Sequence, residues 1–155
     1  LKDAHTIYET LRRDGRLLCQ VYVMGRSLGS APAIELCASH KDIAGCIIES
    51  GYADPIPLVR RRGLHVETIT PEDHALFNNG KKIAGMTCPL LVMHGDEDWL
   101  ISSDEAELNH RQAGSNLKML KILDGVGHND MITSKDYFPS MKSFFSAVKQ
   151  THLSK

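Results

Sequence analysis

Short apolar runs alternate along this chain with longer segments in which apolar residues recur every three or four positions. A short, continuous apolar run is typical of a parallel strand that is buried on both faces. We therefore expect strands at Leu17–Val23, Ala44–Glu49, Pro89–His94 and Lys118–Leu123.

The segments with three- and four-residue spacing predict helices that separate these strands. The first covers Asp3–Asp14, and the second follows Ser27 and ends near His40. A third helix runs from Ser102 to Ala113, and its Ser-Ser-Asp-Glu beginning fits a capping box. The last, Phe138–Gln150, carries one apolar stripe that should pack on a sheet.

The alternation of strands and helices predicts a doubly wound α/β fold with a mainly parallel sheet and right-handed crossovers. Between the second and third strands, the segment 51–87 is polar and contains several prolines and asparagines. We expect a loop-rich excursion there, with a helix or two. The 155 residues fall in the size range of a single domain.

Composition narrows the classes of function. The net charge of -1 and the lack of a basic stripe argue against a nucleic-acid partner. No apolar run approaches the roughly 20 residues that a membrane span needs. The four cysteines form no C-x-x-C pair, so we expect reduced thiols, and the lack of a leader pattern favours a cytoplasmic location.

The sequence Gly25-Arg26-Ser27-Leu28-Gly29 is a G-x-S-x-G motif between a predicted strand and a predicted helix. A tight turn of this kind exposes the serine hydroxyl above a sheet, and glycines on both sides let neighbouring backbone approach. The helix N-terminus that follows stabilises developing negative charge. A serine N-cap in a glycine-flanked turn is the alternative, but the strand-turn-helix context favours a nucleophile.

Two further candidates follow the last two predicted strands. Asp98 ends the sequence HGDED after the third strand, and His128 lies in GVGHND after the fourth. In parallel sheets, ligands bind at the carboxyl ends of the strands. Taken singly, Asp98 could be an ordinary turn residue and His128 an ordinary histidine that faces solvent. Three such residues in the order Ser, Asp, His, each at a strand end, favour a catalytic triad.

On these three motifs the chain resembles the α/β-hydrolase superfamily over essentially its whole length. The family pattern HG-x-x-D selects Asp98 over Asp96 as the acid. The resemblance implies a serine hydrolase in which Ser27 is the nucleophile and His128 the base. The substrate would be a small-molecule ester, thioester or amide, as in the esterase, thioesterase and serine-peptidase-like branches, with no cofactor.

The resemblance also implies that strands are missing. A complete member has roughly three to five strands before the nucleophile strand, and the loop after the third supplies one oxyanion amide. Only 26 residues precede Ser27, so the chain looks like a C-terminal portion, and the amide of Leu28 is the one oxyanion donor we assign. We expect strand 17–23 to be covered by an N-terminal segment of a longer chain, by a second copy in a homo-oligomer, or by the first helix.

Other residues near the strand ends are candidates for lesser roles. Glu49 ends the second strand and is an alternative acid, because a carboxylate there can also reach a histidine above the sheet. Arg26, Tyr52 and Trp99 are possible residues of a substrate pocket. An aromatic side chain at such a position more often packs, and Arg26 could equally anchor a loop.

Two rival functions have some support in the sequence. His94, Asp96, Asp98 and His128 could converge on a metal, but their spacing matches no zinc pattern, so we expect no metal. The rival from another class is a non-catalytic or truncated α/β-hydrolase-like scaffold used for binding. An activated serine would distinguish an enzyme from such a scaffold.

Overall fold

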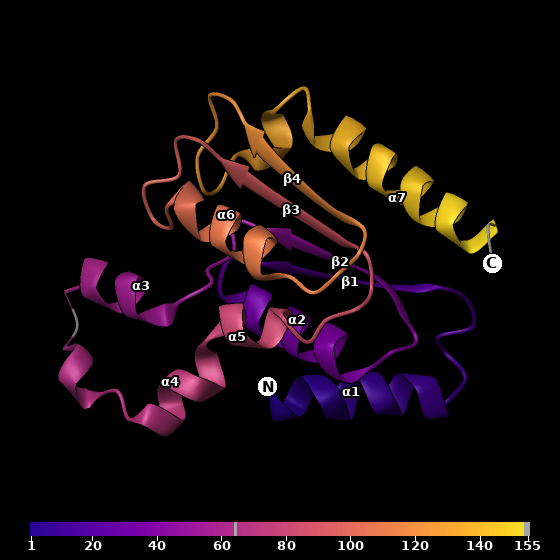
Figure 1. The fold of residues 1–155 in the computed structure, drawn as a ribbon, viewed down its shortest axis with the longest axis horizontal. Coiled ribbons are helices and arrows are strands. Elements are labelled where there is room, and N and C mark those ends of the chain that lie inside the picture. Colours follow the sequence, from indigo (N-terminus) through magenta and orange to yellow (C-terminus); the bar gives the residue numbers. More distant parts are fainter. Residues whose placement is uncertain (64, 154–155) are drawn as a thin grey trace.

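A computed structural model describes residues 1–63 and 65–153, and its centre is one sheet of four parallel strands in the order β1-β2-β3-β4 (Figure 1). The strands are β1 (Val21–Arg26), β2 (Ile43–Glu49), β3 (Leu90–Gly95) and β4 (Lys118–Leu123). Helices cover both faces of the sheet (Figure 1). The predicted doubly wound α/β class is therefore confirmed.

The helices are α1 (Lys2–Arg13), α2 (Ser30–Ser39), α3 (Pro55–Arg61), α4 (Pro71–Phe77), α5 (Asn79–Ile83), α6 (Ser103–Gln112) and α7 (Tyr137–Leu153). Single turns of 3-10 helix lie at Ser27–Gly29, Val66–Thr68 and Met131–Thr133. The described residues of the polar segment 51–87 form three short helices, α3, α4 and α5, where one or two were expected. Among the described residues, no helix has the length and apolar character needed to cross a bilayer.

Alternate residues of the central strands supply the two faces of the core. Ile48 and Val92 point to the face that carries α2, α5 and α6, and α1 packs outside α2 (Figure 1). Ile47 and Leu91 point to the opposite face and pack against Phe144 of α7. Every residue of β2 and β3 is buried, because helices cover both faces of these strands.

The first strand is shifted from its predicted position at 17–23. β1 begins at Val21, which pairs with Ile43, the first residue of β2, so the segment before Val21 has no strand partner on that side. Leu18 is 85% exposed accordingly. At the other end, pairing with Glu49 extends the strand through Arg26, past its predicted end at Val23.

The predicted capping box at the start of α6 is wrong. Ser102 is the N-cap, but its side chain makes no capping hydrogen bond. The Glu105 carboxylate instead accepts hydrogen bonds from the backbone amides of Ala53 and Asp54, at 2.8 and 2.9 Å. With its carboxylate engaged by these two amides, Glu105 does not reach back to the start of its own helix. The two amides directly precede α3, so Glu105 fixes the beginning of α3 against α6.

Candidate active site

The turn between β1 and α2 presents Ser27 in a strained backbone conformation. Its φ is +53°, in the left-handed region that residues with a Cβ rarely adopt. A Cβ on Gly25 would lie 2.4 Å from the Gly29 carbonyl oxygen and 2.6 Å from the Ala33 Cβ. A Cβ on Gly29 would meet open space, so the close approach expected at both glycines exists only at Gly25.

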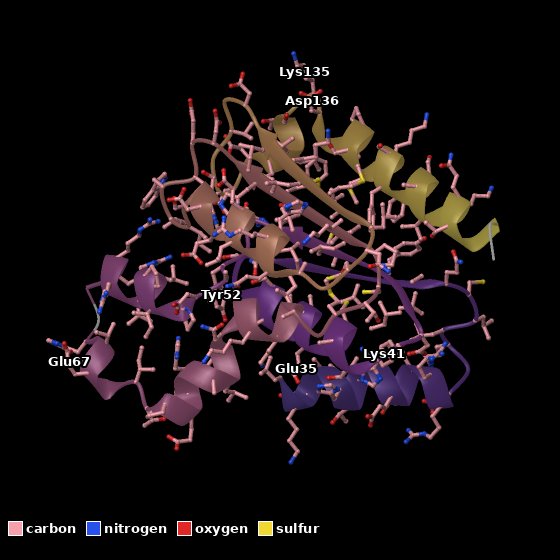
Figure 2. All side chains as sticks on the ribbon, viewed as in Figure 1. Glu35, Lys41, Tyr52, Glu67, Lys135 and Asp136 are labelled. Carbon is pink, nitrogen blue, oxygen red and sulfur yellow. The ribbon has the colours of Figure 1, made fainter. Side chains whose placement is uncertain are left out.

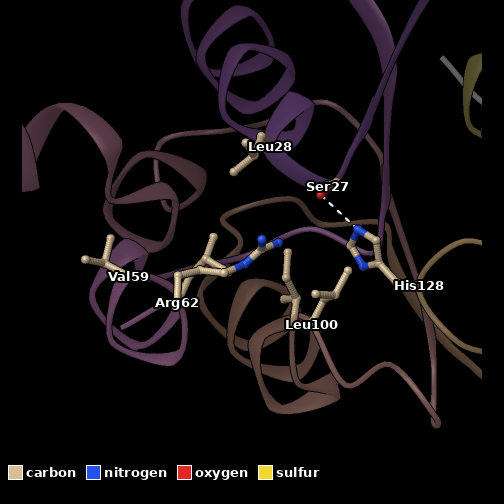
Figure 3. Close-up of a pocket in the computed structure, with 8 residues that line it drawn as sticks. Ser27, Leu28, Val59, Arg62, Leu100 and His128 are labelled. Carbon is tan, nitrogen blue, oxygen red and sulfur yellow. Dashed lines mark hydrogen bonds between the residues drawn. The ribbon is translucent and has the colours of Figure 1, made fainter. Parts of the chain in front are cut away.

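Ser27, His128 and Asp98 form a hydrogen-bonded relay. The His128 ring lies between the other two, with Nδ1 2.7 Å from Asp98 Oδ2. Its Nε2 lies 2.9 Å from Ser27 Oγ (Figure 3). An ionised carboxylate only accepts, so Nδ1 carries the hydrogen and Nε2 is left to accept the serine proton. The three residues follow β1, β3 and β4, which brings them together at the carboxyl edge of the sheet.

Asp98 is held by three hydrogen-bond donors and lies close to a second histidine. Its Oδ1 accepts from the backbone amides of Leu100 and Ile101, both at 2.9 Å. Its Oδ2 receives His128 and lies 3.1 Å from Nε2 of His94. These three hydrogen bonds orient the carboxylate, and its orientation in turn positions the imidazole of His128.

His94 supports this loop as a neutral imidazole. Its Nε2 lies 2.8 Å from the Ile101 carbonyl oxygen, which can only accept, so Nε2 carries the hydrogen. Burial lowers the pKa of His94, outweighing the carbonyl of Ile101 and the charge of Asp98, which raise it. The structure thus places His94 beneath the acid, where it orders the loop that carries Asp98.

The alternative acid Glu49 has other partners. Its Oε2 accepts a hydrogen bond from the Tyr137 hydroxyl at 2.7 Å, and its Oε1 lies 3.1 Å from Nε of Arg26. Burial and the bond to Glu49 raise the pKa of Tyr137 to about 12, which keeps the hydroxyl as a donor. The carboxylate that contacts His128 is therefore that of Asp98.

Arg26 connects this carboxylate to the histidine loop. Its Nη2 donates to the backbone oxygen of His128 at 2.7 Å and to Oδ1 of Asn129 at 2.9 Å. Of the two roles considered for Arg26, the contacts match the loop anchor. Asn129 and Tyr137 belong to the same network and were missed in the sequence, because neither lies in a recognisable catalytic position.

An apolar cavity of about 330 Å³ opens beside the Ser27 hydroxyl. It is lined by Ser27, Leu28, Leu58, Val59, Arg62, Leu100, Ile101 and His128. Arg62 extends from the end of α3 across this cavity (Figure 3). The α3 side chains were not among the predicted pocket residues, since the excursion that carries them has no catalytic motif.

A second cavity, of about 320 Å³, continues from the first. The two share Leu28, Leu58 and Val59, and the second reaches Tyr52 and Phe77. Of the candidate pocket aromatics, Tyr52 is 4% exposed and lies beside α5 (Figure 2).

The two remaining candidates have exposed side chains. Trp99 is 80% exposed and lines neither of these two cavities. Leu28 follows the nucleophile in the turn before α2, and its side chain, 66% exposed, lines both cavities. The role of the Leu28 amide as an oxyanion donor stays a prediction.

With this geometry described, the chain can be compared with known proteins. No family model matches it. It is 27% identical over 139 residues to the alpha/beta hydrolase domain-containing protein aho-3 of Caenorhabditis elegans, covering 85% of this chain and 39% of that protein. It is 30% identical over 129 residues to the human alpha/beta hydrolase domain-containing protein 17C, covering 81% of this chain and 36% of that protein. The chain thus spans less than two fifths of the length of these relatives.

A solved structure shows the same fold. The α/β-hydrolase enzyme MGS-MChE2, from a metagenome of lagoon sediments at Mar Chica in Morocco, superimposes with a TM-score of 0.69 at 19% identity. The match covers 93% of this chain and 68% of that enzyme, so the four strands and their helices correspond to part of a larger fold. From its sequence relatives and its fold together, the chain belongs to the α/β-hydrolase superfamily.

Proposed function

We propose that this chain forms the catalytic part of a serine hydrolase that cleaves an ester, thioester or amide through an acyl-enzyme on Ser27. The observation that carries the proposal is the relay from Ser27 Oγ through His128 to Asp98, with distances of 2.9 and 2.7 Å. Residues 1–155 act in it as one domain. The fold supports a hydrolase scaffold, and the relay supports this particular chemistry.

The chemistry follows from the positions of the two protons. His128 Nε2 takes the proton of Ser27, whose Oγ attacks the substrate carbonyl carbon. The same proton then passes to the leaving alcohol, thiol or amine as the bond to it breaks. A water molecule repeats both steps on the acyl-enzyme and restores Ser27. Asp98 holds the ring and stabilises its charged form throughout.

The strained backbone of Ser27 supports the role of nucleophile. A left-handed φ at a non-glycine residue costs of order 1–3 kcal/mol and is retained where surrounding structure enforces it. Here it turns the hydroxyl toward His128 at the start of the turn that leads into α2. We assign the Leu28 amide to the oxyanion, because it is the next donor along this turn. Loss of one such donor costs about 10²–10³-fold in turnover.

The cavity beside Ser27 fits an apolar group of the substrate. Its walls are leucine, isoleucine and valine side chains, and its polar end is the relay itself. Arg62 adds one positive charge at the wall, where a carbonyl or anionic group of a substrate would find a donor. We infer a small-molecule substrate with an apolar acyl chain.

Hydrolysis of chromogenic esters by variants tests this proposal. Ser27→Ala lowers kcat by at least about 10⁴-fold, because triad members act as a unit. Asp98→Asn lowers it by about 10⁴-fold, because the histidine loses its correct tautomer. Ser146→Ala, an exposed serine on α7, is the control and leaves kcat unchanged.

Two outcomes contradict the proposal. Equal activity of wild type and Ser27→Ala would mean that the nucleophile is another residue. Binding of an acyl ligand without any turnover in wild type would favour the rival, a non-catalytic scaffold. Circular dichroism of each variant shows whether a loss of activity arises from unfolding instead.

A further inference from the structure

A second cluster of ligand-type side chains lies between α1 and the end of α2, away from the relay. His5 and Glu9 are four residues apart on α1, which places both on one face of the helix. His40 ends α2 and lies with its Nε2 3.1 Å from Nδ1 of His5. Ligand atoms of all three residues lie within 4.8 Å of one another.

We propose that His5, Glu9 and His40 bind a Zn²⁺ ion. Two imidazoles and one carboxylate are a donor set that zinc accepts, with water as the fourth ligand. Tetrahedral zinc with bonds of 2.0–2.1 Å separates neighbouring ligand atoms by about 3.3 Å, close to the 3.1 Å between the two imidazole nitrogens. The carboxylate of Glu9 is exposed and closes the remaining gap by a change of rotamer.

The groups behind the two histidines hold them in position for a metal. The far nitrogen of His5, Nε2, lies 3.6 Å from the carboxylate of Glu35, which is itself paired with Lys82. Zinc-bound histidines commonly place the other ring nitrogen against a carboxylate in this way. Figure 2 shows Glu35 on α2, between α1 and α5.

His40 is positioned from a different direction. Its ring packs against that of Tyr8, with centroids 4.5 Å apart, and Tyr8 is 6% exposed. The Tyr8 hydroxyl in turn donates to Asp42 at 3.0 Å. One histidine is thus supported from α2 and the other from α1, so that both rings are ordered before a metal arrives.

A zinc ion here would fasten α1 to the rest of the domain. Tyr8 is the one residue of this 12-residue helix that is fully buried. The metal would cross-link residues 5 and 9 to residue 40, on a separate helix. Because a ligand that binds the folded state raises its stability, Zn²⁺ should raise the melting temperature.

Titration of the protein with Zn²⁺ alone, followed by calorimetry and thermal melting, tests the site. We expect one ion per chain and a rise in Tm. His40→Ala and Glu9→Gln each weaken the Zn²⁺ affinity by at least about 10-fold. Removing a residue that only supports a metal ligand already costs about this much, and removing a ligand costs no less. His110→Ala, a histidine on α6 outside the cluster, leaves the affinity unchanged.

Glu9→Gln keeps the experiment interpretable if His40→Ala fails to fold, because Glu9 is exposed. Wild-type protein that takes up no Zn²⁺ overturns the proposal. Zinc uptake that both cluster variants retain at full affinity also overturns it, as does equal competition by Mg²⁺, which prefers oxygen ligands.

Discussion

At the scale of single residues, close backbone approach at Gly25 determines how the nucleophile is presented. The carbonyl of Gly29 lies where a Cβ of residue 25 would be, and the turn between them carries the strained Ser27. Motif and order along the chain were sufficient to name Ser27, Asp98 and His128. They were insufficient for Asn129 and Tyr137, whose roles depend on contacts between segments far apart in sequence.

The two glycines of the elbow should respond differently to the same change. Gly25→Ala lowers the free energy of unfolding by about 1–3 kcal/mol or more, because the new methyl overlaps backbone that cannot move without disturbing the turn. Gly29→Ala meets open space at a φ of -65° and changes stability by less than about 0.5 kcal/mol. Urea unfolding of both variants checks the difference, and equal losses would contradict it.

Two arginines near the relay should affect different kinetic constants. Arg26→Met releases the His128 loop and lowers kcat by about 10-fold with little change in KM, because the base is displaced while the cavity is intact. Arg62→Met alters the cavity wall and raises KM more than it lowers kcat. Steady-state kinetics on one ester substrate measures both. A rise in KM alone for Arg26→Met would argue that it binds substrate.

The buried neutral His94 predicts a pH dependence of stability. Burial depresses its folded-state pKa below the ordinary 6.5, so below about pH 6.5 the unfolded chain holds a proton that the folded chain lacks. The free energy of unfolding therefore falls as the pH is lowered through this range. Denaturant unfolding at several pH values should show a smaller fall in His94→Gln than in wild type. Identical pH dependence in the two proteins would contradict the assignment.

At the scale of secondary-structure elements, α3 builds the cavity wall although no catalytic motif lies in it. Its sequence shows only a helix start, with Asp54 as N-cap and Pro55 at the first helical position. The strands and the long helices could be predicted because their apolar patterns repeat. The position of α3 instead depends on Glu105 of α6, which accepts hydrogen bonds from the two amides that precede α3. Because Glu105 makes these two hydrogen bonds, the capping box predicted at the start of α6 does not form. The first strand shifted because its length is set by pairing with β2, which no local pattern reveals.

The position of α3 predicts a change in acyl-chain preference. Leu58→Ala enlarges both cavities and moves the optimum of kcat/KM toward longer acyl chains, since each buried methylene contributes about 0.8 kcal/mol. Leu76→Ala on α4 makes the same change at a 47% exposed side chain that lines neither of these two cavities, and leaves the optimum unchanged. A series of chromogenic esters of increasing length measures both. An unmoved optimum in Leu58→Ala would exclude this cavity as the acyl site.

At the scale of the whole molecule, β1 is an edge strand: within the described residues it pairs with β2 on one side and with no strand on the other. The expectation that a longer chain, a second copy or the first helix covers this strand stays a prediction, and α1 packs against α2. The chain also spans less than two fifths of the length of the relatives named above. The motifs in its sequence name one oxyanion donor, the Leu28 amide, and no particular substrate.

The central claim is that Ser27 is an activated nucleophile, and a fluorophosphonate tests it most directly. The serine oxygen displaces fluoride from phosphorus and leaves a stable adduct, a reaction that requires the base to remove the serine proton. Mass spectrometry of the labelled protein should find one adduct, on the peptide that contains Ser27, and neither Ser27→Ala nor His128→Ala should acquire it. A folded wild-type protein that stays unlabelled, or an adduct on another residue, would contradict the account.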